Sequence, residues 1–233
     1  MKIKLKRSII PALDVADLRK AKEIVKATCQ VKGVSAYKVG FSLAIPYGLK
    51  KVVEEIRKLT DLPIIYDHQK AGTDIPDTGN LFMEVCKESG VDYIIIFPQA
   101  GPVTEEKWIE AAKRSGLNII VGGEMTHPGY LENENGFLKT NAPMRMYQIA
   151  SNLGVTDYVV PGNRPEQIKK YREFLENKGI KPVFYSPGLV SQGGSITEGA
   201  KAAGEQWHAI IGRAIYEAKE MTKAAEELVK GLE

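Results

Sequence analysis

The chain has 233 residues, 43% hydrophobic and 26% charged, and is therefore long enough to bury the core of a globular protein. Its net charge of +3, from 32 basic and 29 acidic residues, is too balanced to suggest a surface for nucleic acid or for a membrane. Two cysteines, Cys29 and Cys86, form neither a CxxC motif nor a cysteine–histidine cluster, which argues against a disulfide framework and a zinc site.

The N-terminal sequence MKIKLKRSII is basic but leads directly into a strand pattern. It lacks the apolar region and the small-residue cleavage site of a signal peptide, and no later run could span a bilayer. We therefore expect a cytoplasmic protein.

Apolar strand patterns and amphipathic helix patterns alternate along the chain. We expect strands at residues 8–14, 35–40, 63–66, 93–97, 117–122, 157–160, 182–186 and 208–211. We expect helices from residue 17 onward and at 45–59, 80–89, 105–115, 142–152, 165–177, 197–203 and 214–232. A polar insertion, LENENGFLKTN, precedes the helix at 142–152.

Strand–helix units of roughly 25 to 30 residues, about eight in all, predict an α/β fold of the (β/α)8 TIM-barrel type. A doubly wound open sheet is the alternative, but such sheets usually stop at about five or six units, and no GxGxxG follows the first strand. Because there is no linker and no low-complexity segment, we expect residues 1–233 to form one domain.

Residues at the carboxyl ends of the strands are the site candidates, because the loops that follow the strands of such a barrel meet at one mouth. These candidates are Asp14, Lys38, Asp67, Lys70, Asp74, Thr126, Pro187, Gln192, Gly193, Gly194, Gly212 and Arg213.

Lys38, Asp67, Lys70 and Asp74 alternate in charge, so each group favours the ionised form of its neighbour. An ammonium held between carboxylates suits a reaction in which negative charge develops on the substrate. A surface ion network without function is the alternative for this set.

Two glycine-containing loops predict a phosphate site. Gly193 and Gly194 lie in one loop, and Gly212 and Arg213 end the last strand. Backbone N–H groups together with an arginine are typical of phosphate sites in these barrels.

Seven motifs at strand ends, in order, resemble the orotidine 5'-phosphate decarboxylase family over nearly the whole chain. They are ALDV at 12–15, YKVG at 37–40, DIPDT at 74–78, EMTHPG at 124–129, PGNRPE at 161–166, SPG with QGG between Ser186 and Gly194, and IIGRAIY at 210–216. The resemblance implies a barrel that converts orotidine 5'-phosphate to uridine 5'-phosphate, the last step of pyrimidine nucleotide synthesis, without a metal ion or cofactor.

The resemblance also implies roles for the residues around the reacting carbon. Asp14 and Lys38 would bind the ribose hydroxyls, and Lys38 would also fix Asp67 against the substrate carboxylate. Lys70 would stabilise the carbanion and then protonate it. In a homodimer, Asp74 and Thr78 would reach the site of the partner.

The remaining roles concern the pyrimidine and the phosphate. By the same resemblance, Thr126 would contact the pyrimidine edge and Pro187 would line the pocket for the leaving CO2. Gln192 and Arg213 would hold the phosphate, and residues 188–195 would close as a lid.

The sequence departs from the family at its charged motif. The family pattern is Asp-x-Lys-x-x-Asp, whereas Asp67, Lys70 and Asp74 are separated by one more residue in each gap. Strand positions three apart face opposite sides, so we expect a bulge near residues 68–69 or an early exit from the strand, helped by Gly72. Altered chemistry or substrate choice is the alternative for this lengthened motif. We expect His68 to have a structural hydrogen-bonding role, with catalysis as the alternative.

Two other functions stay open. A related sugar-phosphate decarboxylase or aldolase would need Mg2+ at an acidic strand end, for which Glu124 is the nearest candidate. A nucleotide-binding barrel without catalytic activity is the other.

Overall fold

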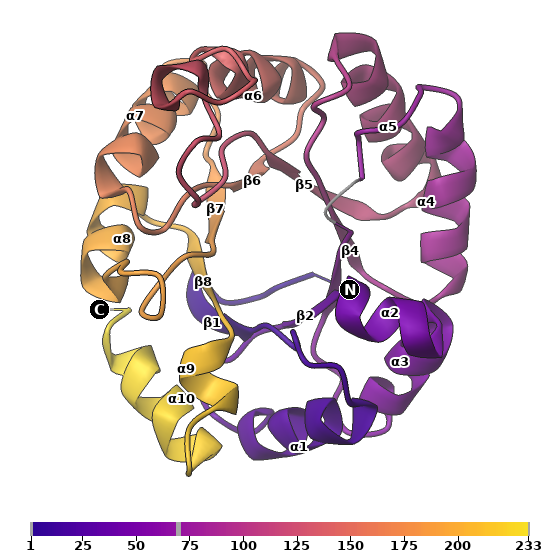
Figure 1. Ribbon diagram of the computed structural model, residues 1–233, viewed down its shortest axis with the longest axis vertical. Coiled ribbons are helices and arrows are strands. Elements are labelled where there is room, and N and C mark those ends of the chain that lie inside the picture. Colours follow the sequence, from indigo (N-terminus) through magenta and orange to yellow (C-terminus); the bar gives the residue numbers. More distant parts are fainter. Residues whose placement is uncertain (1, 69–70, 233) are drawn as a thin grey trace.

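The computed structural model describes residues 2–68 and 71–232. Eight strands form one parallel sheet in the order β1-β8-β7-β6-β5-β4-β3-β2. They are β1 (Arg7–Pro11), β2 (Tyr37–Gly40), β3 (Ile64–Asp67), β4 (Tyr93–Ile96), β5 (Asn118–Gly122), β6 (Asp157–Val159), β7 (Val183–Ser186) and β8 (Trp207–Ile211). Backbone hydrogen bonds from Ile9 to Gly33 and from Leu13 to Lys38 join β1 to the β2 segment. The sheet therefore closes into the predicted barrel, which Figure 1 shows from its mouth.

The helices surround this barrel, mostly one after each strand. They are α1 (Leu18–Thr28), α2 (Phe41–Tyr47), α3 (Leu49–Arg57), α4 (Thr78–Glu88), α5 (Pro102–Ser115), α6 (Ala142–Asn152), α7 (Pro165–Glu176), α8 (Ile196–Ala203), α9 (Arg213–Tyr216) and α10 (Met221–Lys230). A 3-10 turn, η1 (Glu132–Glu134), lies in the polar insertion.

Two helices expected to be continuous are each divided in two. The segment expected at 45–59 is interrupted at Gly48, whose φ of +78° a helix cannot contain. The segment expected at 214–232 is interrupted at residues 217–220. There the chain changes direction, because α10 packs back against α1 and β1. Periodicity alone cannot show either break, since both halves keep an apolar face.

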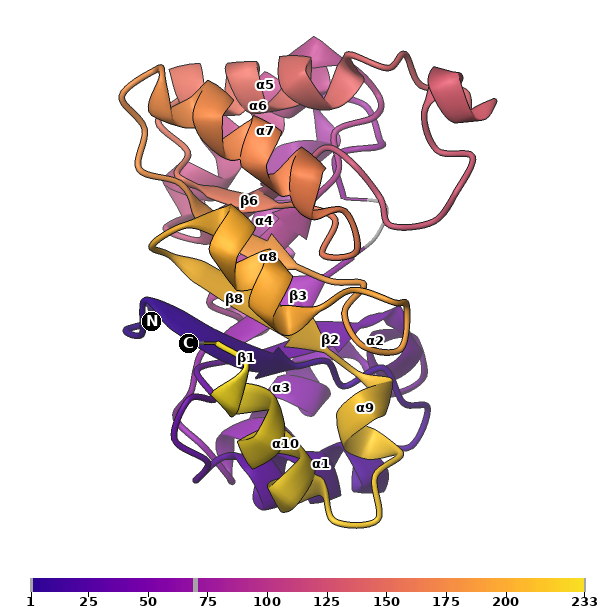
Figure 2. The same ribbon diagram turned by 90° about the vertical axis from the view of Figure 1, so that its left-hand side faces the viewer.

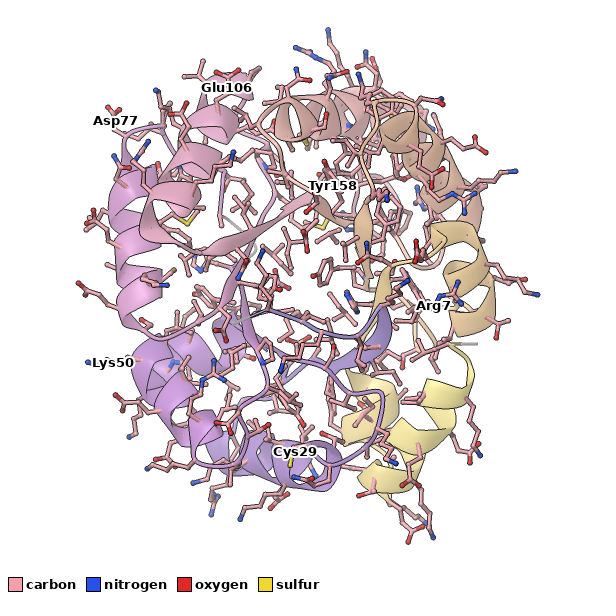
Figure 3. All side chains as sticks on the ribbon, turned by 180° about the vertical axis from the view of Figure 1, so that it is seen from behind. Arg7, Cys29, Lys50, Asp77, Glu106 and Tyr158 are labelled. Atoms are coloured by element: carbon pink, nitrogen blue, oxygen red, sulfur yellow. The ribbon has the colours of Figure 1, made fainter. Side chains whose placement is uncertain are left out.

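Alternation along the strands divides the apolar side chains into two groups. Side chains such as Ile64 and Tyr66 of β3 pack outward, in the cluster that also contains the helix residues. Ile65 of the same strand packs inward, together with Ile10, Tyr185 and others. Side chains therefore fill the barrel interior, which Figure 3 shows from the end opposite the mouth.

The two ends of the barrel differ. Both chain termini lie at one end, and the loops that follow the strands lie at the other, where the insertion around η1 projects furthest (Figure 2). Within residues 2–68 and 71–232, no helix combines the length and apolarity needed to cross a bilayer.

Candidate active site

A cavity of about 240 Å³ opens at the mouth of the barrel. Residues from the ends of several strands line it, as expected for the functional face of this fold. Of the candidates from the sequence, the lining contains Asp14, Lys38, Asp67, Thr126, Pro187, Gln192, Gly212 and Arg213.

Lys38 lies at the centre of a charge cluster in which Lys38 and Asp67 are buried and Asp14 is exposed. Its ammonium Nζ is 3.0 Å from Oδ1 of Asp14 and 3.0 Å from Oδ2 of Asp67. Residue 40 on β2 pairs with Asp67 on β3, so Lys38 and Asp67 both point inward from neighbouring strands. Burial alone would lower the pKa of Lys38, but the charges of Asp67 and Asp14 outweigh it and raise this pKa. Lys38 is therefore a fixed positive charge inside the cavity.

Only the first residue of the charged motif, Asp67, belongs to a barrel strand. Strand β3 ends at Asp67, and the phenol of Tyr66 is 2.7 Å from Nδ1 of His68. This contact fits the structural role expected for His68. Lys70 lies outside the described residues, and so does Gln69, on which part of the expected bulge falls.

Ala71 and Gly72 pack against the residues that follow strand β4. The N–H of Ala71 donates to the carbonyl of His68 at 2.7 Å, and the N–H of Phe97 donates to the carbonyl of Ala71 at 2.8 Å. Gly72 has a φ of +84°, and a Cβ there would lie 3.0 Å from Cα of Pro98. Residue 72 therefore has to be a glycine. This is the glycine that we expected to help the chain leave the strand.

Asp74 and Thr78 do not line the cavity of their own chain. Asp74 is exposed, and its carbonyl accepts a hydrogen bond from the hydroxyl of Thr104 on α5 at 3.0 Å. The next carbonyl, of Ile75, accepts from the indole of Trp108 at 3.1 Å and from the hydroxyl of Thr78 at 2.9 Å. Helix α5 thus holds the backbone of the segment that carries Asp74 to the surface.

A side-chain hydrogen bond joins two loops over the cavity. The hydroxyl of Thr126, after β5, donates to Oε1 of Gln192, after β7, at 2.9 Å. Thr126 also touches the second loop at Gly188, where a Cβ would lie 2.6 Å from its methyl carbon. These contacts hold the loop after β7 at the wall of the cavity.

Gly193 and Gly194 belong to this loop but not to the cavity lining. The N–H of Gly193 donates to the carbonyl of Val190 at 3.0 Å, and that of Gly194 donates to Gly188 at 3.2 Å. Both donors are thus used within the loop. Arg213, at the start of α9, is exposed at the mouth and forms no ion pair with any residue in the described parts of the chain.

A family model described as "Orotidine 5'-phosphate decarboxylase / HUMPS family" matches residues 7–228. The chain belongs to this family. A Pyrococcus furiosus protein named orotidine 5'-phosphate decarboxylase is 38% identical over 221 residues, which cover 94% of this chain and 95% of that protein. One of the same name from Methanosarcina barkeri is 34% identical and covers 98% and 96%.

Solved structures agree with this assignment. Orotidine 5'-monophosphate decarboxylase from Methanocaldococcus jannaschii, complexed with the inhibitor BMP, is 29% identical and superposes with a TM-score of 0.84, covering 97% of this chain and 98% of that one. The enzyme from Pyrococcus horikoshii superposes with a TM-score of 0.79 at 27% identity, covering 96% and 98%.

In this member of the orotidine 5'-phosphate decarboxylase / HUMPS family, Glu124 lies outside the active-site cavity. The residue is 2% exposed, and its carboxylate accepts hydrogen bonds from Arg164, at 2.9 Å, and from the phenol of Tyr171. Arg164 also pairs with Glu134 of the insertion at 2.7 Å. Glu124 therefore anchors the loops around Thr126 and is fully engaged by its partners.

The apolar part of the cavity was missed by sequence reasoning, which selected charged residues and glycines at the strand ends. The lining contains the inward-facing side chains Ile95, Phe97, Met125, Val159 and Ile210. The alternation of inward-facing and outward-facing residues along the strands could have identified them, because each of these apolar residues faces inward near a strand end. Gly122 makes room for the ring of Phe97, because a Cβ at residue 122 would lie 2.3 Å from it.

Proposed function

We propose that this barrel converts orotidine 5'-phosphate to uridine 5'-phosphate without a metal ion or cofactor, and that Lys70 donates the proton. The observation that carries the proposal is the buried Lys38, held between Asp14 and Asp67 in a cavity with an apolar wall. The near full-length match to decarboxylases of the same family supports it.

The chemistry needs such a preorganised site. Breaking the bond between the ring carbon and the carboxylate releases CO2 and leaves the electron pair on the ring carbon. No ring orbital delocalises that pair, so fixed positive charge in a water-poor cavity must stabilise it. In the proposal, Asp67 lies against the substrate carboxylate, and the Lys70 ammonium stabilises the carbanion and gives it a proton.

The rest of the substrate would be held by the other lining residues. Asp14 and Lys38 would bind the ribose hydroxyls, and Thr126 the pyrimidine edge. Pro187 would line the pocket for CO2. The lining residues Gln192, Gly212 and Arg213 would hold the phosphate, together with Gly193 and Gly194 of the loop after β7, which lie outside the lining. Gly193 and Gly194 would exchange their present carbonyl partners for the phosphate as the loop closes. Binding energy from the phosphate would then order the site.

A homodimer would complete the site with Asp74 and Thr78 of the partner subunit. Asp74 is exposed and lies outside the cavity of its own chain. Large apolar side chains are exposed on α2, on α4 and in the loop before α4: Phe41, Ile45, Leu81, Val85 and Ile75. An exposed apolar surface of this kind is typical of an interface between protein chains.

The metal-dependent alternative is less consistent with the geometry. Its candidate ligand, Glu124, is committed to Arg164 and Tyr171 and does not line the cavity. A carboxylate with these partners would have to give up both to bind a cation that also contacts the substrate.

The decisive experiment follows the loss of orotidine 5'-phosphate absorbance in the presence of EDTA. The wild-type chain is compared with Lys70→Ala and with the matched control Lys51→Ala, an exposed lysine on α3. We expect rapid turnover by the wild type and the control, and a decrease of at least about a hundredfold in kcat for Lys70→Ala. Full activity of Lys70→Ala would refute the role of Lys70. Binding of uridine 5'-phosphate without turnover would indicate the binding protein, and turnover only of sugar phosphates with Mg2+ would indicate the metal-dependent enzyme.

A further inference from the structure

Glu105 on α5 is a buried acidic side chain that the proposed reaction does not use. It is 1% exposed, and its Oε1 atom has no hydrogen-bond partner among the residues of the described structure. Burying a carboxyl group without a partner is costly, because the group loses its water and gains nothing in return. Such a group is expected where a ligand supplies the missing hydrogen bonds.

Glu105 lines a second cavity of about 240 Å³, which shares no lining residue with the active-site cavity. This cavity lies between the first turns of α5 and α6 and is closed by the end of the insertion. Its walls are largely apolar and include Met146 and Ile149 of α6 and Leu138 of the insertion.

Glu105 lies on the buried face of α5, together with Thr104, Trp108 and Ile109, and so at the inner side of this cavity. After burial and the charge of Asp157, the charge of Glu105 contributes to raising the pKa of Tyr158 on β6, the strand residue labelled in Figure 3. Glu105 therefore lies in the layer between the strands and the helices. A ligand would have to enter between α5 and α6 to reach it.

The outer rim of the cavity has a different chemistry. Phe137 of the insertion is fully exposed and lines the cavity, which leaves an aromatic face for a planar ring. Lys139 and Arg145 also line it, and both are exposed. Neither forms an ion pair with a residue in the described parts of the chain, so two cations are free to bind an anion at the rim.

We propose that this cavity is a second ligand site, which takes the base of a nucleoside monophosphate with its phosphate at the rim. Ring N–H or amino groups of the base would donate to Glu105, and Phe137 would stack on the base. Lys139 and Arg145 would bind the phosphate. Pockets for drug-sized ligands measure about 300–1,000 Å³, so a cavity of about 240 Å³ fits the ring system while the phosphate stays outside.

The two chemistries of the cavity exclude simpler ligands. An inorganic anion would satisfy Lys139 and Arg145 but leave Glu105 without a partner. An organic cation would satisfy Glu105 but meet both positive charges at the entrance. A nucleoside monophosphate carries N–H donors at one end and an anion at the other. It can therefore donate to Glu105 at the inner side of the cavity and bind Lys139 and Arg145 at the rim.

The test is a calorimetric titration of the full-length protein with guanosine 5'-monophosphate and adenosine 5'-monophosphate. Two variants separate the cavities: Glu105→Leu alters the second cavity, and Arg213→Ala alters the active site. Phe137→Ala is a further variant at an exposed position, where the fold is not at risk. We expect Glu105→Leu to weaken binding of at least one nucleotide by about tenfold or more. Phe137→Ala should weaken it as well, and Arg213→Ala should leave it unchanged.

Three results would overturn the proposal. They are no binding of either nucleotide at millimolar concentration, binding that only Arg213→Ala weakens, and an effect of Glu105→Leu and Phe137→Ala on dimer dissociation instead of nucleotide binding. Turnover of orotidine 5'-phosphate by Glu105→Leu is measured in parallel and should equal that of the wild type. If the proposed function is wrong, the turnover assay shows no activity with the wild type, whatever the titration shows. If the second site is wrong, the titration shows no binding that depends on Glu105, whatever the turnover assay shows.

Discussion

Replacing Glu105 with glutamine should change how the stability of the protein depends on pH. Burial, with a smaller contribution from the charge of Glu106, raises the pKa of Glu105 from 4.5 to about 8. The folded protein therefore keeps this proton at pH values where the unfolded chain has lost it. The stabilising contribution is complete below the unfolded pKa and is lost as the pH rises through the folded pKa.

The size of the effect follows from the two pKa values. Between about pH 5 and pH 7, ionisation in the unfolded chain alone should lower the free energy of unfolding of the wild type by about 2 to 3 kcal/mol. Glutamine occupies nearly the same volume and does not ionise. The Glu105→Gln variant should therefore lack this decrease.

Urea unfolding of both proteins at several pH values, in buffers without nucleotides, measures the difference. Glu106→Gln is the matched control, because Glu106 is the exposed neighbour on the same helix. Its free energy of unfolding should run parallel to that of the wild type across the pH range. The free energy of unfolding of Glu105→Gln could also run parallel to that of the wild type across the pH range. Glu105 would then be hydrated or hydrogen-bonded in solution, and the argument for the second cavity would fail.

Three further variants test the active-site geometry. Lys38→Met should abolish turnover. It should also lower the free energy of unfolding, measured by urea unfolding, by about 3 kcal/mol, because the buried carboxylate of Asp67 loses its ion pair with Lys38. Thr126→Val should raise KM by up to about tenfold in steady-state assays, because the hydrogen bond to Gln192 is lost, and an unchanged KM would contradict this. Trp108→Phe should lower kcat while leaving the melting temperature nearly unchanged, because the indole N–H holds the segment before α4. A fall in kcat that appears only together with a large fall in the melting temperature would indicate a merely structural role.

The sequence by itself determined the order of the elements and the barrel. Strand and helix patterns are local, so eight strands and most helix positions could be read from periodicity, and the seven motifs indicated the family. The sequence also indicated which residues lie at the mouth, because a parallel barrel brings all strand ends to one face. Asp14, Lys38 and Asp67 line one cavity for that reason, although their roles stay predictions.

Only the tertiary structure decided which partner each of these side chains has. Lys38 lies between carboxylates from two other segments, and Thr126 bonds to a residue 66 positions away. Glu124, which the sequence offered as a metal ligand, is bound by Arg164 and Tyr171. Glu105 looked like any charged residue in the first turn of a helix, since neither its burial nor its lack of a partner leaves a local signal. Partners and burial depend on which distant segments meet, and that is settled by packing after the elements have formed.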